Sequence, residues 1–436
     1  MSSIADMVRD FGVVGAGGAG FPTHVKIDAA KPEYIIANGA ECEPLLRVDQ
    51  QVMEFHAYSV VEGLRLVMRH TKAARGVIAL KDHYKKAIEA LRRELSGSTD
   101  ITLFIMRSYY PAGDEQQIVY EVTGRVVPTG GIPLDVGAVV SNVSTLMYVA
   151  GAAQNIPVTE KYVTVSGAVS RPATLKAPIG ISMKKLVDAA GGTTTECDYI
   201  IGGPCMGRVV TDIDIPVIKT TGGIIAIPKG HPLLYKKSDQ VNLQLIKAVC
   251  CQCSMCTQMC PRNSLGLRVE PHKAMRSLAQ NVDLLDNPNG VFSCCDCGIC
   301  TYCACNFGLK PSNVMALMKA GLQKAGVKPK KEVYTTVDRG IDTKKFPTSR
   351  LIHRLGISEY DVAAPMDTNL IETDRVKIPL KMHIGAPSKP VVDVGRQVKK
   401  GELIADIPEK ALGAKVHASI DGKVTDVSGE YIEIKV

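Results

Sequence analysis

The sequence predicts a multidomain protein that combines α/β and α+β domains, and three observations support this class. The chain has 436 residues, which at typical domain sizes corresponds to roughly three or four domains. The first third alternates short apolar runs with helical patterns, as a Rossmann-like domain does. Two dense cysteine runs past the middle indicate a two-cluster ferredoxin-like helical domain, and the end of the chain is rich in strand patterns.

The expected strands and helices of the N-terminal domain alternate along the chain. Short apolar runs predict buried strands, and longer amphipathic segments predict helices. In chain order these are a strand at Tyr34–Ala37, a helix at about Val52–His70, a strand at Gly76–Leu80, a helix at Asp82–Leu95 and a strand at Ile101–Met106. This order favours a doubly wound, largely parallel sheet.

A glycine-rich loop precedes the first strand, and its sequence from Phe11 to Lys26 is FGVVGAGGAGFPTHVK. Glycines leave the backbone bare, so its N–H groups can approach a phosphate or a flat ring. Lys26 adds a positive charge. A plain glycine turn is the alternative, because a lone GxGGxG pattern has low specificity.

Polar residues follow the strands at the edge where α/β sheets bind ligands. Asn38, Glu41 and Glu43 end the first strand, within YIIANGAECEP. The third strand runs into a second glycine-acid loop, YPAGDEQQIVYEVTG, before a helix. Asn142 and Thr145 then precede an apolar helix. We therefore expect the ligand site of this domain at that edge.

The first cysteine run predicts an iron–sulfur site. Cys250, Cys253, Cys256 and Cys260 fall at C-x2-C-x2-C-x3-C, and Pro261 follows at once. That is the spacing of a bacterial-type [4Fe–4S] site. Two-residue gaps let a tight loop wrap three thiolates around one cluster, and the fourth comes from elsewhere.

The second run repeats the core of this pattern and then departs from it. Cys294, Cys297 and Cys300 are in phase, but Ala304 stands where the fourth cysteine is expected, between Cys303 and Cys305. In two-cluster ferredoxins the fourth cysteine of each run serves the other cluster. We therefore expect one cluster on Cys250, Cys253, Cys256 and Cys305, and a second on Cys294, Cys297, Cys300 and Cys260.

Alternatives remain for the ligand set. Structural zinc also uses CxxC pairs, although it needs no third in-phase cysteine in each run. In a second alternative, Cys295 or Cys303 takes the place of a neighbouring cysteine as a cluster ligand. Cys303 ranks below Cys305 as the fourth ligand, because it leaves the chain one residue fewer in which to turn away from the first three ligands. Cys42, Cys197 and Cys205 are expected to be buried apolar residues.

Two further segments have strand patterns. The segment from Lys161 to about Lys229 predicts two strands and a short helix that ends at Gly191-Gly192. The segment Val376–Val436 has the glycine spacing of a lipoyl-like barrel-sandwich hybrid. Lys410 stands near the position of a lipoyl lysine, and a solvated hairpin lysine is the alternative.

Composition excludes several classes of function. The net charge is +8, and no Lys/Arg-rich run with interleaved aromatics argues for nucleic acid. No apolar stretch is long enough for a transmembrane segment, and the N-terminus lacks a secretion signal. There are 14 cysteines, most of them in the two runs, so we expect metal in a reducing, cytoplasmic setting rather than disulfides.

The loops GAGGAGFPTHVK, NGAECEP, YPAGDEQ and VSNVSTL resemble the FMN- and NADH-binding subunit of respiratory complex I, and more so the C subunit of the Rnf electron-transport complex. The resemblance implies a flavin/NADH domain with NADH near Phe21 and Glu43. Ala16 and Ala40 replace an arginine and an aspartate that are usual in complex I. The resemblance implies FMN binding by Gly15, Gly17, Gly18, Lys26, Asn38, Glu41, Gly113, Glu115, Asn142 and Thr145.

In the same families a soluble-ligand-binding β-grasp domain follows the flavin domain, and residues 161–229 resemble it. The barrel-sandwich segment comes last here, whereas in the Rnf subunit it comes first. That order resembles the cobalamin reductases of propanediol-utilising bacterial microcompartments. The expected domains are 1–158 (FMN/NADH), 159–235 (β-grasp), 236–328 (clusters), a linker at 329–372 and 373–436 (barrel-sandwich hybrid).

This resemblance implies electron transfer from NADH through FMN and the two clusters to cobalamin, for a B12-dependent enzyme. The implied partners are NADH, cobalamin or a cobalamin-handling enzyme, and microcompartment shell proteins. No acid–base pair or nucleophile is required, so no catalytic side chain is expected. The rivals are an Rnf-like electron-input subunit of a membrane ion pump and a cluster-bearing scaffold without flavin activity.

Overall fold

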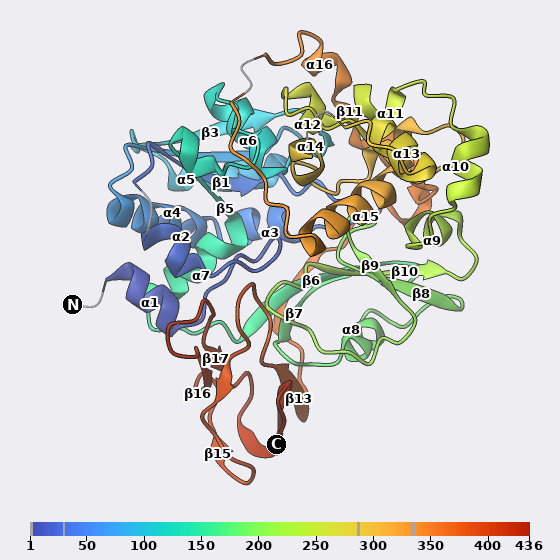
Figure 1. Cartoon of the computed structure of the whole chain (residues 1–436). Coiled ribbons are helices and arrows are strands. Elements are labelled where there is room, and N and C mark those ends of the chain that lie inside the picture. Colours follow the sequence, from blue (N-terminus) through green and yellow to red (C-terminus); the bar gives the residue numbers. More distant parts are fainter. Residues whose placement is uncertain (1–2, 29–30, 286–287, 334–335) are drawn as a thin grey trace.

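The computed structural model contains an N-terminal α/β domain, a cluster domain and two β-rich domains, which pack against one another (Figure 1). The structure describes residues 3–28, 31–285, 288–333 and 336–436. None of the helices in these ranges is long and apolar enough to cross a membrane.

The N-terminal domain is built on a four-stranded parallel sheet of order β3-β2-β1-β5. The three predicted strands are confirmed, and a fourth lies beside the first. In the register of β1 and β5, Asn38 pairs with Asn142, so both polar strand ends meet at one edge. The strands are β1 (Tyr34–Gly39), β2 (Arg75–Lys81), β3 (Ile101–Met106) and β5 (Ala138–Asn142).

Helices cover this sheet, and one of them differs from the prediction. The prediction of a single helix over Val52–His70 is wrong, because the chain leaves helical geometry at His56 and forms two helices. His56 Nε2 lies 2.8 Å from the Tyr162 hydroxyl, a contact made outside the helix. The helices are α1 (Ile4–Asp10), α2 (Thr23–Asp28), α3 (Val48–Phe55), α4 (Ala57–Thr71), α5 (Lys85–Glu94), α6 (Glu115–Thr123) and α7 (Val143–Ala153), with a 3-10 turn η1 (Pro133–Val136).

The β-grasp region forms a six-stranded mixed sheet of order β12-β7-β6-β10-β8-β9. The predicted pair of strands and short helix are present, and Val163, Leu186 and Ile224 lie in its core. The elements are β6 (Glu160–Gly167), β7 (Ala173–Pro178), α8 (Met183–Ala189), β8 (Cys197–Ile201), β9 (Arg208–Val210), β10 (Gly223–Pro228) and, from much later in the chain, β12 (Met366–Leu370).

The cluster domain consists of short helices around the cysteine loops. The helix predicted at Asn313–Ala325 is present as α15, and it packs with α13 through Met275, Val314 and Met315. The elements are α9 (Pro232–Lys237), α10 (Leu243–Val249), α11 (Met255–Gln258), α12 (Pro261–Ser264), α13 (Pro271–Gln280), α14 (Asn289–Phe292), η2 (Cys300–Ala304) and α15 (Pro311–Lys324).

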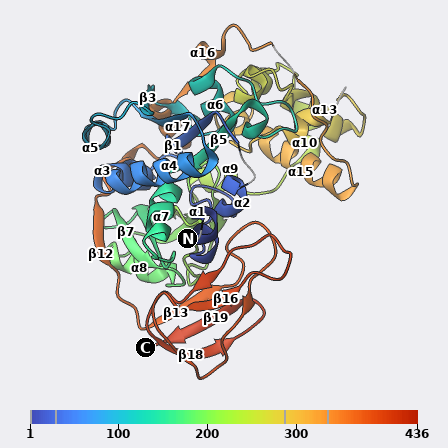
Figure 2. The ribbon, with the colours of Figure 1, turned by 90° about the vertical axis from the view of Figure 1, so that its left-hand side faces the viewer.

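The segment expected to be a linker, 329–372, contains helices and two strands, and it pairs with two other domains. β11 pairs with β4 of the N-terminal domain, and β12 pairs with β7 on the outer side of the β-grasp sheet (Figure 2). Residues 334–335 of this segment lie outside the described ranges. Its elements are α16 (Ile341–Lys344), β11 (Phe346–Pro347), α17 (Thr348–Leu355) and η3 (Ser358–Tyr360), and β4 is Tyr109–Tyr110.

The C-terminal domain packs two small antiparallel sheets against each other, β13-β19-β18-β15 and β14-β16-β17. Buried Lys219 of the β-grasp region ties this domain to the segment after α1, because its Nζ donates to the carbonyls of Gly12 (2.6 Å) and Lys415 (2.8 Å). The side chain of Lys410 is 90% exposed. The strands are β13 (Arg375–Pro379), β14 (Lys389–Pro390), β15 (Gln397–Val398), β16 (Leu403–Asp406), β17 (Val416–His417), β18 (Gly422–Val427) and β19 (Tyr431–Lys435).

Candidate functional site

A cavity of about 540 Å³ lies at the carboxyl ends of β1 and β5, and three domains line it. The glycine loop and the strand ends form one wall, the β-grasp loop around Gly203 a second, and the second cysteine run a third. Of the predicted cofactor residues, those that line it are Gly17, Gly18, Asn38, Glu41, Glu43, Gly113, Glu115 and Asn142.

The glycine loop presents bare backbone to this cavity. A Cβ on Gly17 would lie 2.7 Å from the Asn142 side chain, so only glycine fits there, and a Cβ on Gly18 would meet nothing within 4 Å. The N–H of Ala16 donates to the Thr145 hydroxyl (2.9 Å), which fixes the loop on α7. The open space beside Gly18 is where a ligand can approach the main chain.

The end of β1 is held by its own polar side chains. Asn38 Nδ2 donates to the carbonyl of Gly113 (2.9 Å), and the Asn38 carbonyl oxygen accepts from the N–H of Ala40 (3.1 Å). The carboxylate of Glu41 accepts from the N–H groups of Val48 and Asp49 at the start of α3. Loss of solvent raises the pKa of Glu41, and the nearby Asp49 charge raises it further.

Asp49 connects the end of β5 to α3. Its carboxylate accepts from Asn142 Nδ2 (2.8 Å) and from the Ser144 hydroxyl (3.2 Å). Desolvation raises the pKa of Asp49. Asn142 also caps α7, because its side chain accepts from the N–H of Ser144. Asn142, which is predicted to bind the cofactor, therefore lies at the cavity, and its amide group already makes hydrogen bonds to Asp49 and Ser144.

Glu43, expected near NADH, is engaged by other parts of the protein. Its carboxylate accepts from the backbone N–H groups of Cys205 (2.8 Å) and Met206 (3.0 Å) and from the Tyr110 hydroxyl (3.1 Å). The Tyr110 hydroxyl also lies 2.8 Å from the Cys297 carbonyl. Desolvation raises the pKa of Glu43. In this structure Glu43 joins the N-terminal domain to the β-grasp loop.

Four predicted residues do not line the cavity. Lys26 forms an ion pair with Glu115 (2.9 Å), and Phe21 is an exposed ring beyond the glycine loop. Thr145 is buried in α7, and Gly15 forms the base of the loop by donating its N–H to the Phe21 carbonyl. Thr145 and Gly15 therefore shape the loop.

Sequence reasoning missed two chemically important lining residues, Asp49 and Lys161, and considered Cys295 only as an alternative cluster ligand. Lys161 is 2% exposed, and its amine donates to the Ala16 carbonyl (3.1 Å). The available signal was the position of Lys161 directly beside the apolar run of β6. A lysine in a buried strand indicates a partner nearby, because lysines are rarely buried without one.

The thiols of the first run gather with one thiol of the second. Cys250, Cys253, Cys256 and Cys305 line a hollow of about 40 Å³. Burial raises the pKa of Cys256 to about 12, and the neighbouring charges of the other three raise it as well. Cys251 lies at the same hollow. The four thiols that the sequence predicts for the first cluster therefore lie around one hollow.

The remaining thiols form the second group. Burial raises the pKa values of Cys294 and Cys300. A hydrogen bond with Cys295, followed by burial, raises the pKa of Cys297. The charge of Cys260 adds to each of the three shifts. Cys303 lies apart, beside the charges of Arg354 and Lys236. Cys295 belongs to the same group through its hydrogen bond with Cys297, so it stays an alternative to the expected ligands Cys260, Cys294, Cys297 and Cys300. Cys303 does not line the hollow of the first group.

The three cysteines outside the runs are half-buried or buried, as expected. Cys197 and Cys205 lie in apolar cores, and Cys42 lines the cavity. Desolvation raises the pKa of Cys42 to about 12. Its thiol is therefore neutral near pH 7.

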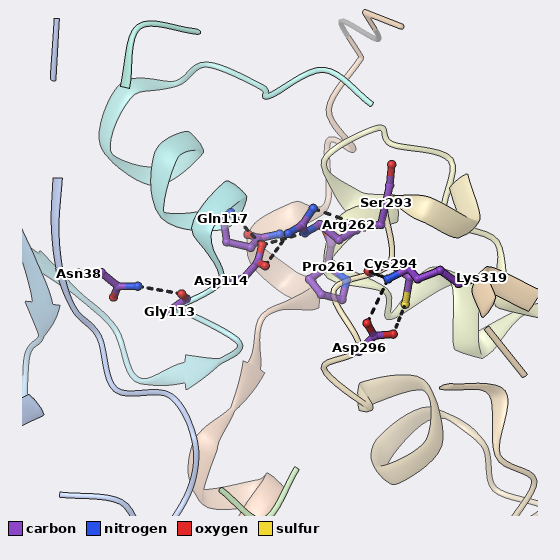
Figure 3. A network of polar contacts seen from close by, with 10 residues as sticks. All are labelled: Asn38, Gly113, Asp114, Gln117, Pro261, Arg262, Ser293, Cys294, Asp296 and Lys319. Atoms are coloured by element: carbon purple, nitrogen blue, oxygen red, sulfur yellow. Dashed lines mark hydrogen bonds and ion pairs between the residues drawn. The ribbon is translucent and has the colours of Figure 1, made fainter. Parts of the chain in front are cut away.

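A buried ion pair fastens the cluster domain to the N-terminal domain (Figure 3). The guanidinium of Arg262 donates to both oxygens of Asp114, at 2.7 and 2.9 Å. Beside it, Gln117 Nε2 donates to the Pro261 carbonyl (2.8 Å). Cys295 and Cys297, from the next loop, line the same cavity as the glycine loop. The flavin-type loop and the second cysteine run therefore face one common space.

Comparison with known domain families agrees with this organisation. Residues 8–151 match the Nuo51 FMN-binding domain and residues 162–209 the SLBB domain. Residues 249–310 match a 4Fe-4S dicluster domain, and residues 363–434 the RnfC barrel sandwich hybrid domain. The expected multidomain architecture is confirmed.

Comparison with whole proteins defines the family. The chain is 39% identical to the cobalamin reductase PduS of Citrobacter freundii and 40% identical to that of Salmonella typhimurium; each match covers 99% of this chain and 96% of the relative. It is 36% identical to the RnfC-type component of the Na(+)-translocating ferredoxin:NAD(+) oxidoreductase complex of Acetobacterium woodii, over 59% of this chain and 58% of that component. The chain therefore belongs to the family of the PduS cobalamin reductases.

Proposed function

We propose that this oxidoreductase takes electrons from NADH and reduces cobalamin, with one FMN and two [4Fe–4S] clusters as resident cofactors. One observation carries the proposal. The cavity lined by the glycine loop is also lined by Cys295 and Cys297, so a flavin and an iron–sulfur site would be neighbours.

The residues around the cavity fit a flavin. Bare backbone at Gly18 leaves open space in which a flat ring can approach. Gly17 and Gly113 let the loops pack closely against Asn142 and the Ala40 carbonyl, where a Cβ would lie at 2.7 Å in each case. Asn38 and Asn142 fix the two strand ends beside that surface. These residues, with Glu41 and Glu115, would hold FMN. Gly15, Lys26 and Thr145 would support the loop from behind.

The two thiol groups fit cubane clusters. Each contains four cysteines from both runs, the sharing that two-cluster ferredoxins use. A bound flavin supplies the chemistry that joins a two-electron nicotinamide donor to one-electron iron–sulfur centres. The task of the protein is to hold these centres close together and shield them from water, and the Arg262–Asp114 pair contributes by docking the cluster domain.

We assign NADH to the outer side of the glycine loop. There the Phe21 ring is 38% exposed, and a planar aromatic face can stack on a nicotinamide or adenine ring. Glu43 stays in the proposal as a residue that shapes the cavity on its β-grasp side, since its carboxylate oxygens accept hydrogen bonds from the β-grasp loop.

Cobalamin as the acceptor is supported by the names of the two PduS relatives. By the same family resemblance we propose a location inside a bacterial microcompartment, with shell proteins as partners. Co-purification with shell proteins from cells that assemble the compartment tests this location. Recovery of the protein only with a membrane complex would favour the Rnf-like alternative.

The decisive experiment uses anaerobically prepared full-length protein. We expect about eight iron atoms per chain, a yellow flavin absorbance bleached by NADH, and NADH-driven reduction of cobalamin faster than that of a ferredoxin acceptor. Zinc in place of iron would remove the clusters from the proposal. Protein that NADH does not bleach would be a scaffold, and protein that ignores cobalamin would have another acceptor.

A further inference from the structure

Lys161 is a buried cation that the β-grasp (SLBB) domain places in the wall of the cofactor cavity. It is the second residue of β6 and is 2% exposed. Its Nζ donates to the carbonyl oxygen of Ala16 at 3.1 Å. Ala16 begins the part of the glycine loop that lines the cavity. The amine therefore lies where the second domain meets the loop that would carry the flavin.

The hydrogen bond to Ala16 uses one of the three N–H groups of Lys161. Within the described part of the chain, the other two make no hydrogen bond or ion pair. The charges of Glu41 and Asp49 act on the amine. Their oxygens, however, already accept hydrogen bonds from the start of α3 and from two side chains at the end of β5. Among the described residues, neither carboxyl group makes a hydrogen bond or an ion pair with Lys161.

A buried ammonium group with free donors is costly unless an acceptor reaches it. Lys161 also borders a second cavity, of about 320 Å³. Its amine is bonded to Ala16, which lines the cofactor cavity and not the second one, so the charged end of the side chain lies at the cofactor cavity. We propose that Lys161 binds an anionic group of the flavin, so that the SLBB domain completes the cofactor site. This inference rests on the proposed function, since it requires FMN in the cavity.

Two parts of FMN offer the same chemistry to a cation. The phosphate is anionic in every redox state, and the ring system gains negative charge when it is reduced. Riboflavin contains the ring but has no phosphate, so a comparison of the two flavins separates the sources. Either contact would give a strong charge-assisted hydrogen bond.

The test uses the full chain with its clusters intact and its flavin removed. Dissociation constants of FMN and riboflavin are measured by quenching of flavin fluorescence for wild type, Lys161→Gln and Lys161→Arg. We expect Lys161→Gln to weaken FMN binding about tenfold or more, because it loses a hydrogen bond to a charged group. Lys161→Arg, which keeps the charge, is expected to retain most of the affinity. Unchanged riboflavin affinity would identify the phosphate; weaker riboflavin binding with a more negative flavin potential would identify the ring.

Lys176→Gln is the matched control. Lys176 is a half-buried lysine on the neighbouring strand β7, paired with Glu160 (2.7 Å), and it does not line the cavity. We expect the flavin affinity of the Lys176→Gln protein to equal that of wild type. If Lys161→Gln folds and binds both flavins like wild type, Lys161 is only a counter-ion of Glu41 and Asp49 and the inference is wrong. Wild-type protein that binds neither flavin would overturn the proposed function itself, and this inference with it.

Discussion

The carboxylate of Glu43 in the N-terminal domain accepts a hydrogen bond from the backbone N–H of Cys205 in the β-grasp domain, at 2.8 Å. With the N–H of Met206 and the Tyr110 hydroxyl, it connects three regions that are far apart in the sequence. The β-grasp loop thereby closes one side of the cofactor cavity, so the cavity depends on how the domains dock as well as on the N-terminal domain itself.

Replacement of Glu43 therefore has a structural consequence. Glu43→Ala leaves two backbone N–H groups without their acceptor, whereas the Tyr110 hydroxyl keeps the Cys297 carbonyl. We expect a loss of unfolding free energy of about 2 kcal/mol or more. Chemical denaturation of the anaerobic protein measures it. Glu115→Ala, which removes a half-exposed ion pair, is the control and is expected to cost less than about 1 kcal/mol. A Glu43→Ala protein with wild-type stability and only a raised KM for NADH would restore Glu43 as a nicotinamide contact.

The position of Cys303 gives a prediction about iron content. Cys305 lies with the thiols of the first run, whereas Cys303 lies beside Arg354 and Lys236. We expect Cys303→Ala to keep about eight iron atoms per chain and Cys305→Ala to keep about four, since one cubane loses a ligand. Iron and sulfide analysis of anaerobically purified variants decides between them. The reverse pattern would make Cys303 the ligand.

The Arg262–Asp114 ion pair is expected to stabilise the contact between the cluster domain and the N-terminal domain. Both side chains are close to 10% exposed, at 11% and 9%, and breaking one buried partner typically costs about 3–5 kcal/mol. Asp114→Asn is therefore expected to lower stability by this amount and to slow reduction of the clusters by NADH. Thermal unfolding and the visible spectrum record the two effects.

The control for this variant is Glu33→Gln, at the exposed Arg125–Glu33 pair (41% and 39% exposed). It is expected to change stability by less than about 1 kcal/mol. Equal effects of the two substitutions would mean that Arg262 and Asp114 are solvated in solution and do not dock the domains.

Local features of this protein could be predicted from its sequence. The strands of the N-terminal sheet follow from apolar runs, because these depend on residues close in the chain. Lys161 and Glu43 could not be assigned their partners, since Ala16 and Cys205 lie 145 and 162 residues away from them. The sequence around such a residue can indicate that it needs a partner, but it does not identify that partner in another domain.

The same reasoning explains why two predicted segments differ from the structure. The break at His56 accompanies a contact with Tyr162 in another domain. Strand β12, in the segment expected to be a linker, exists only because β7 offers it an edge. Neither the amphipathic pattern before the break nor the composition of the linker contains information about these distant partners.

The affinity for FMN is expected to depend on pH through the groups that face Lys161. Desolvation lowers the pKa of Lys161 to about 8, so the amine is charged at pH 7 and loses its charge as the pH rises through that value. Burial raises the pKa of the facing Glu41 to about 8, so this carboxyl gains negative charge over the same range. The pKa of the facing Asp49 is raised as well. Both changes weaken the hold on an anion. We therefore expect the dissociation constant of FMN to rise between about pH 7 and 9, and less steeply in Lys161→Gln. Fluorescence titrations at constant ionic strength measure it, and an affinity that is flat or rises over this range would contradict a cationic Lys161 at the flavin.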